Sequence, residues 1–409
     1  MSWSGGTSGS LPSGSAPSPG LPVIPPAVTR KHGLRGVLFT VLVGLALLVG
    51  TGVMALVLLA SGRPDALAVG LVLAVLPVPP LVAIYLWLDR YEPEPLRLLA
   101  SAFAWGALVA TSVALLLQYA DQIVNGSTEE WSAVVMAPVT EEATKGVFVL
   151  LLVWARRHYV DGMLDGLVYA GLVGIGFAFT ENILYFAGAY TGGPEFGEGG
   201  IGAATGLFVL RGVLSPFAHP LFTSAVGLGV GVLVVSSHPL RYLAPVAGYV
   251  VAVVAHAAWN GSAFLDDGRY FLLTYLFAMV PGLLTLAGLA VWFRVREGKM
   301  LARSLTDLAG HGYLSLDEVP WLVRLSARRT ARSNAALRGG TMGERVMRDY
   351  QQQAIELAML HDRVIRGRAP AEARERGELM ARRLAVLRAH LMFPTHADLS
   401  WPQHREGWS

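Results

Sequence analysis

Eight apolar runs, each long enough to cross a bilayer, restrict what this chain can fold into. A helix needs about 20 apolar residues to span the hydrocarbon, where every backbone polar group must be satisfied within the protein. The runs lie at roughly 36–60, 66–88, 98–120, 131–155, 163–189, 202–236, 242–264 and 270–293. Only 15% of the residues are charged, against about a quarter in soluble domains. The sequence therefore predicts an all-α polytopic membrane protein with about eight transmembrane helices.

Prolines predict breaks in two of these runs. The sixth run is too long for one straight helix and contains Ser215-Pro216 and His219-Pro220. The second run contains the stretch Leu-Pro-Val-Pro-Pro at 76–80. Residues before proline avoid the helical region, and broken backbone at membrane depth is tolerated where it is buried in protein or lines a cavity. We expect a break or kink in both runs.

Basic residues alternate between the loops and predict the orientation. The loops assigned to one side carry Arg30, Lys31, Arg35, Arg90, Arg97, Arg156, Arg157, Arg241, Arg294, Arg296 and Lys299. The opposite loops hold only Arg63 and Arg269, together with several acids. Cytoplasmic loops carry the excess of Lys and Arg. The pattern predicts a multi-pass protein of the cell membrane with both termini in the cytoplasm.

Composition divides the chain into three parts. Residues 1–35 are rich in Gly, Ser and Pro and predict a disordered cytoplasmic N-terminus. Residues 36–296 form the transmembrane domain, and 297–409 form an Arg-rich cytoplasmic tail. Apolar residues at helical spacing, one set from Met347 to Val364 and another from Met380 to Leu391, predict a small helical C-terminal domain. We find no phosphate-binding or zinc-finger motif and expect no nucleic-acid partner.

Five motif positions with ionisable side chains lie inside the apolar runs: Glu141, Glu142, Glu181, His219 and His256. Such residues are costly in hydrocarbon, face the bundle interior and usually mark function. Counted at about 1.5 Å per residue, Glu141, Glu181 and His256 lie some 12–15 Å from the outer ends of their spans, at a common depth. The chain has no cysteine, so a metal here would need His and carboxylate ligands.

Helical spacing identifies interaction partners for these side chains. Lys145 follows Glu141 by four residues and Glu142 by three, so it can pair with either acid. His256 and Asn260 are four residues apart and share a helix face. Arg211 also lies within a span, and we expect a glutamate to pair with it. The same residues would also serve as ion pairs or hydrogen bonds that only hold helices together.

The ordered set of motifs resembles the PrsW family of intramembrane proteases, which is related to CAAX-type prenyl endopeptidases. The motifs cover residues 80–265 and are Asp89-Arg-Tyr-Glu-Pro-Glu-Pro95, Glu141-Glu142-x-x-Lys145, Phe177-x-x-x-Glu181-Asn182, His219-Pro-Leu-Phe222 and His256-x-x-Trp259-Asn260. The resemblance implies a metal-dependent peptidase that cuts membrane-anchored proteins; the best-known family role is the first cleavage of an anti-sigma factor. It also implies that Glu141 and Glu142 are catalytic and that His219 and His256 bind metal or water.

The leading hypothesis is an intramembrane endopeptidase in which Glu141 or Glu142 is the general base. The predicted ligands of a divalent metal are Glu181, His219 and His256. Zinc suits two His and a carboxylate with one open position. Lys145 would tune the glutamates and Asn260 would support the oxyanion.

Other readings remain open. The sequence has no His-Glu-x-x-His motif, so a metal-free glutamate/histidine mechanism also stands. The predicted substrate is a membrane-anchored protein in the lipid bilayer, cut near the extracytoplasmic face. The alternatives are a proton- or solute-coupled transporter, in which buried acids relay protons, and a non-catalytic scaffold of the same fold.

Overall fold

The computed structural model describes residues 33–193, 196–265, 269–367 and 372–393. Within these ranges the chain is helical, and the one extended pairing is an isolated bridge between Gly193 and Gly197. Most of the predicted disordered segment 1–35 lies outside the described residues. The chain divides into two compact units, one from Arg30 to Arg303 and one that includes Ser304 onward. The predicted all-α, multi-pass membrane fold is confirmed.

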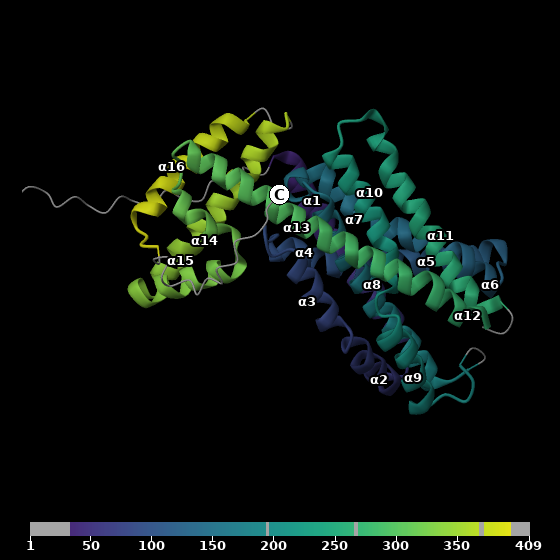
Figure 1. Ribbon diagram of the computed structural model, residues 1–409. Coiled ribbons are helices and arrows are strands. Elements are labelled where there is room, and N and C mark those ends of the chain that lie inside the picture. Colours follow the sequence, from purple (N-terminus) through teal and green to yellow (C-terminus); the bar gives the residue numbers. More distant parts are fainter. Residues whose placement is uncertain (1–32, 194–195, 266–268, 368–371, 394–409) are drawn as a thin grey trace, which may run out of the picture. The chain divides into compact units, whose positions relative to one another are not determined.

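The first unit is built from long helices joined by short connections (Figure 1). Its α-helices are α1 (Leu34–Ala60), α2 (Pro64–Val75), α3 (Val78–Leu88), α4 (Leu96–Ala104), α5 (Thr111–Asn125), α6 (Glu129–Trp131), α7 (Ala137–Arg156), α8 (Met163–Thr191), α9 (Ile201–Phe208), α10 (Ala218–Val235), α11 (Ala244–Phe264), α12 (Arg269–Thr274) and α13 (Val280–Gly310). Short π-helical turns continue several of them: η1 (Trp105–Ala110), η2 (Ser132–Met136), η4 (Val209–Leu214) and η7 (Tyr275–Met279). The 3₁₀ turns are η3 (Arg157–Tyr159) and η5 (Pro239–Leu243).

Among the described residues, seven helical segments are long and apolar enough to cross a membrane. They correspond to seven of the eight predicted runs. The fourth predicted run is also helical, because α6, η2 and α7 follow one another without a gap from Glu129 to Arg156. Helix α7, which carries Glu141, Glu142 and Lys145, is not among the seven.

Both predicted proline breaks are present. The second run is interrupted between α2 and α3, after Val75. The sixth run has a π-helical turn, η4, and then leaves the helix at Ser215–Phe217 before α10 begins at Ala218. π-Helical turns and helix breaks are frequent at functional sites, and here the break places His219 in the first turn of α10.

Helix α8 lies at the centre of the membrane unit. In its most apolar 18-residue window 83% of the residues are buried, against 17% for α1. Glycine allows its neighbours to approach closely. A Cβ on Gly174 would lie 2.8 Å from the Cα of Pro220, and one on Gly106 would lie 1.9 Å from the carbonyl oxygen of Val173. These contacts hold η1 and the start of α10 directly against α8.

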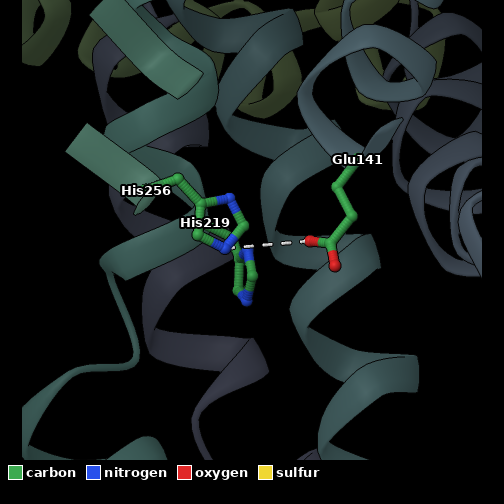
Figure 2. Close-up of side chains that lie close together, drawn as sticks. All are labelled: Glu141, His219 and His256. Carbon is green, nitrogen blue, oxygen red and sulfur yellow. Dashed lines mark ion pairs between the residues drawn. The ribbon is translucent and has the colours of Figure 1, made fainter. Parts of the chain in front are cut away.

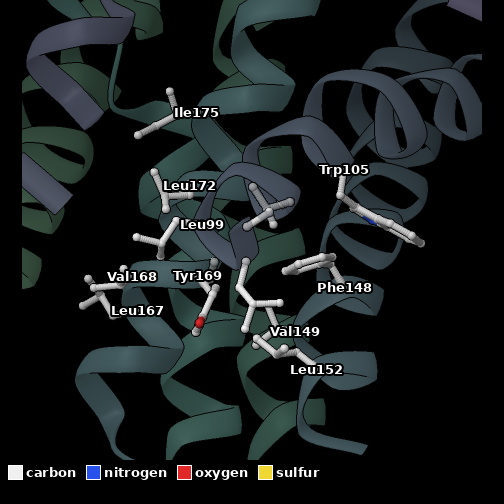
Figure 3. Packing of buried hydrophobic residues seen from close by; sticks show 14 of the residues in the cluster. Leu99, Trp105, Phe148, Val149, Leu152, Leu167, Val168, Tyr169, Leu172 and Ile175 are labelled. Carbon is white, nitrogen blue, oxygen red and sulfur yellow. The ribbon is translucent and has the colours of Figure 1, made fainter. Parts of the chain in front are cut away.

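A hydrophobic core joins α7 to α8 (Figure 3). The rings of Trp105 and Phe148 pack with centroids 5.8 Å apart, and the indole of Trp105 donates a hydrogen bond to the carbonyl of Thr144. Val149 and Leu152 continue this packing along α7 and are fully buried. The core begins one turn from Lys145. Its packing therefore fixes the rotation of α7 about its own axis, and with it the direction of Glu141, Glu142 and Lys145.

The second unit is a set of helices in the C-terminal tail: η8 (Leu316–Glu318), α14 (Val319–Val323), α15 (Leu325–Ile365) and α16 (Ala373–Ala389). The predicted stripes form its interior, where Met347, Tyr350, Met380 and Leu384 are fully buried. Glu318 is buried among them and accepts hydrogen bonds from Tyr350 and Arg388.

Candidate active site

Helix α7 places two carboxylates and an ammonium group together in the interior. The Nζ atom of Lys145 lies 2.8 Å from Oε1 of Glu142 and 3.3 Å from Oε2 of Glu141. Lys145 and Glu142 are completely buried. Lys145 also lies 3.7 Å from the centre of the Phe177 ring on α8. Buried charges are stable only when paired and hydrogen bonded, and this lysine has both acids as partners.

The two histidines meet these acids from α10 and α11. The rings of His219 and His256 are nearly perpendicular, with centroids 5.2 Å apart. Nδ1 of His256 lies 3.1 Å from Oε1 of Glu142, while its Nε2 lies 3.9 Å from Oε2 of Glu141. Figure 2 shows Nε2 of His256 directed at the Glu141 carboxylate. Because Glu142 holds one ring nitrogen, the other is left facing Glu141.

Further contacts keep these side chains in position. Phe222, one turn along α10 from His219, stacks on the His256 ring at 4.9 Å. Thr223 donates a 3.0 Å hydrogen bond to Glu142, and Gln118 of α5 donates a 3.4 Å bond to Glu141. Thr223 and Gln118 were not predicted from the sequence as parts of the site. Thr223 follows His219 by four residues, so its position on the same helix face was a usable signal.

Glu181 on α8 reaches the site through His219. Its Oε2 lies 2.7 Å from Nε2 of His219, and the same carboxylate pairs with Arg211 of η4. Arg211 donates a 2.8 Å hydrogen bond to Asn182 and stacks 4.1 Å above the Tyr185 ring. The expected pairing of Arg211 with a glutamate is confirmed. Arginine fixes Glu181, and Glu181 in turn fixes one nitrogen of His219.

One group of three buried side chains, the only one among the described residues, could hold a metal ion: Glu141, His219 and His256. A ligand atom from each lies within 4.8 Å of the others. Two imidazoles and a carboxylate are a zinc-type donor set, so the residues fit the ion by chemistry and spacing. Lys145 lies 3.1 Å from Nδ1 of His219. A metal bound through that nitrogen would have to displace the lysine.

The structure therefore brings six of the seven predicted site residues together. Glu141 stands in the donor group where the sequence predicted Glu181, and Glu181 contacts His219 from outside the group. Asn260 shares the helix α11 with His256, but its amide donates to the carbonyl of Ala133 at 2.9 Å. Among the described contacts Asn260 therefore joins α11 to η2.

Comparisons with known proteins relate the sequence around this site to a family of proteases. The family described as PrsW family intramembrane metalloprotease matches residues 94–286, which include every residue of the site. "Protease PrsW" of Bacillus subtilis (strain 168) is 25% identical over 218 residues, covering 53% of this chain and 88% of that protein. "Protease PrsW" of Geobacillus kaustophilus (strain HTA426) is 31% identical over 146 residues, covering 35% and 57%. The protein of that name in Oceanobacillus iheyensis is 30% identical over 148 residues, covering 36% and 61%. No solved structure matches significantly.

Proposed function

We propose that the buried site of this chain, which matches the PrsW family of intramembrane metalloproteases over residues 94–286, hydrolyses a peptide bond of a membrane-anchored protein. One observation carries the proposal: Glu141 and His256 face each other across 3.9 Å inside the protein. That gap is too long for a direct hydrogen bond, and a water can bridge two polar groups at such a separation. A water held there has a carboxylate beside it to accept its proton.

Glu141 is the general base in the metal-free form of this scheme. Its carboxylate takes a proton from the water as the oxygen attacks the scissile carbonyl carbon, and returns a proton to the amide nitrogen as the C–N bond breaks. Lys145 and Gln118 hold the carboxylate in place. Glu142 orients His256 through Nδ1. Asn260 stands one turn from His256, and we assign the N–H of its amide that does not donate to Ala133 to the developing oxyanion.

In the alternative, metal-bound form of the scheme, Glu141, His219 and His256 would hold the divalent metal that the family implies, with zinc the ion that suits this donor set best. When bound, the ion would supply Lewis-acid polarisation of the carbonyl and a more acidic water. Glu181 then acts on His219 from outside the ligand set, since hydrogen-bonded carboxylates commonly orient ligating histidines. Arg211 pairs with Glu181 and holds its carboxylate in place for that task.

The charges of the loops indicate how the chain is oriented in the membrane. We propose that the chain lies in the cell membrane with both termini cytoplasmic, since its basic loops alternate with acidic ones. The site then lies in the outer half of the bilayer, and cleavage occurs near the extracytoplasmic face. A single-span protein such as an anti-sigma factor is the substrate class. We assign the activity to residues 36–296.

A reconstituted assay tests the function. Purified full-length protein in proteoliposomes should cleave a single-span protein at one or a few bonds, identified by mass spectrometry. Glu141→Gln should abolish cleavage while the protein keeps its thermal unfolding transition. Wild-type cleavage by Glu141→Gln would overturn the mechanism. Accumulation of solute in the vesicles without cleavage would instead favour the transporter alternative, which the match to proteases does not favour.

A further inference from the structure

A pocket of about 600 Å³ opens at one end of the membrane unit, away from the catalytic side chains. Its walls come from the turn between α1 and α2, from the last two turns of α8, from the loop after α8 and from the start of α6. Ser61, Glu129, Leu184, Gly188, Thr191 and Phe196 are among the lining residues. On the orientation proposed above, this is the extracytoplasmic end.

The pocket lies further along α8 than the catalytic side chains, toward the end of the helix. Leu184, Gly188 and Thr191 line it at three- and four-residue spacing, which makes one stripe on the helix. Glu181 continues that stripe one turn deeper. At about 1.5 Å per residue, the pocket begins within roughly 5 Å of Glu181 along the helix axis and extends to roughly 15 Å from it.

Aromatic contacts link the two places as well. Phe196 lines the pocket and packs edge-on against Tyr185 with ring centroids 6.4 Å apart. The guanidinium of Arg211 stacks on the face of the Tyr185 ring. Arg211 pairs with Glu181, which holds His219. A chain that occupies the pocket therefore lies beside the side chains that orient the site.

The charged side chains that line the pocket indicate what kind of group it could bind. The guanidinium of Arg63 is paired with Asp65 through two bonds of 2.9 and 3.0 Å, so its charge is already balanced. The side chain of Glu129 lines the same pocket and has no hydrogen-bond or ion-pair partner in the part of the chain that the structure describes. Among the described residues, the pocket thus combines apolar walls from Leu184 and Phe196 with a negative charge that no neighbouring cation balances.

We propose that this pocket binds the extracytoplasmic juxtamembrane segment of the substrate and takes a Lys or Arg side chain against Glu129. The proposal rests on the proposed function, because it assigns a specificity site to the same protease. An extended chain advances about 3.3 Å per residue. The basic residue therefore lies about three to five residues on the extracytoplasmic side of the cleaved bond.

A charge swap tests this assignment with the full-length protein in proteoliposomes. Glu129→Lys should lower kcat/KM about tenfold, mostly through KM, for a single-span substrate with Lys four residues outside the cleaved bond. A substrate with Glu at that position should be cut poorly by the wild type and about tenfold better by Glu129→Lys. The matched control is Glu130→Lys, because Glu130 stands in the same first turn of α6 but does not line the pocket. It should leave both substrates unaffected.

Each other outcome overturns the proposal. Equal losses on both substrates, or equal effects of Glu129→Lys and Glu130→Lys, would mean that Glu129 is structural. Losses that follow the fraction of phosphatidylethanolamine in the vesicles, and not the substrate's charge, would mean that the pocket holds a lipid headgroup. Glu141→Gln separates this test from the proposed function. If Glu141→Gln abolishes cleavage but the effect of Glu129→Lys does not depend on the substrate's charge, the proposed protease function stands. Only the role of the pocket is then rejected.

Discussion

Glu142 and His256 are hydrogen bonded across two helices, with Oε1 of the glutamate 3.1 Å from Nδ1 of the histidine. Glu142 also accepts from Lys145 and Thr223, so all of its described partners lie in the interior. This bond decides which nitrogen of His256 faces Glu141. The carboxylate of Glu142 thereby orients both the imidazole of His256 and the ammonium group of Lys145.

Glu142→Ala should lower the thermal stability of the protein while leaving its fold unchanged. The change leaves Lys145 with Glu141 as its one acidic partner on α7 and removes the acceptor for His256 and Thr223. Removing one partner of a buried pair costs about 3–5 kcal/mol. Thermal unfolding in detergent measures the loss. Glu142→Gln is the control, since it keeps the shape, and an unfolding temperature equal to the wild type in Glu142→Ala would contradict the role.

Glu141→Gln should reduce turnover by about 10²–10⁴-fold, the usual contribution of a positioned general base. The amide is isosteric with the carboxylate, so the hydrogen bond from Gln118 can persist. Single-turnover cleavage of a labelled single-span protein measures the effect. A loss of less than about fivefold would mean that another group accepts the proton.

Metal content distinguishes the two glutamates that could be ligands. Removal of metal by a chelator should stop cleavage, and zinc should restore it. Glu141→Gln and His219→Ala should bind less than stoichiometric metal, because both residues stand in the donor group. Glu181→Gln should keep the metal but lose affinity or activity by about 10–100-fold, as expected for a group that orients a ligand. Full metal loss in Glu181→Gln alone would make Glu181 the ligand.

The close approach of α8 and α10 should be essential to activity. A side chain at Gly174 would meet the backbone of Pro220 at 2.8 Å, so Gly174→Val must move the first turn of α10 and His219 with it. We expect cleavage to fall to background. Gly206→Val in α9 is the matched control, because a Cβ there meets nothing within 4 Å. Equal activity of the two variants would show that His219 tolerates the movement.

The loop between α3 and α4 should make stability depend on pH. Burial raises the pKa of Asp89 to about 8 and that of Glu94 to about 11, and nearby Asp165 raises both further. A carboxyl with a raised folded pKa stabilises the fold fully below its unfolded pKa, about 4, and this contribution is lost as pH rises through the folded value. The unfolding temperature should therefore fall between pH 5 and 9, and Asp89→Asn should flatten that slope. An unchanged slope in Asp89→Asn would contradict the assignment.

Local patterns predicted much of this architecture. Hydropathy located the helices, and the prolines at 76–80 and around 216 located both breaks. The position of Lys145 one turn from Glu141 and Glu142 predicted the ion pairs that the structure contains. These features depend on distances along one helix, which backbone geometry sets whatever the rest of the chain does.

Contacts between helices were less predictable. The sequence could not say that Asn260 would donate to Ala133, or that Gln118 from α5 would reach Glu141. It did indicate that Arg211 needed an acidic partner, because a lone guanidinium in a span is costly. It could not say which acid, since that depends on where η4 lies against α8.

By itself, then, the sequence determined that the protein is helical and membrane-spanning and that acids and histidines share one depth. Only the tertiary structure decided that Glu141 joins both histidines while Glu181 is held by Arg211. The reason is physical. Residue spacing sets depth along a helix, but the rotation and separation of neighbouring helices set which side chains meet. Those are determined by packing, such as Gly174 against Pro220 and Trp105 against Phe148.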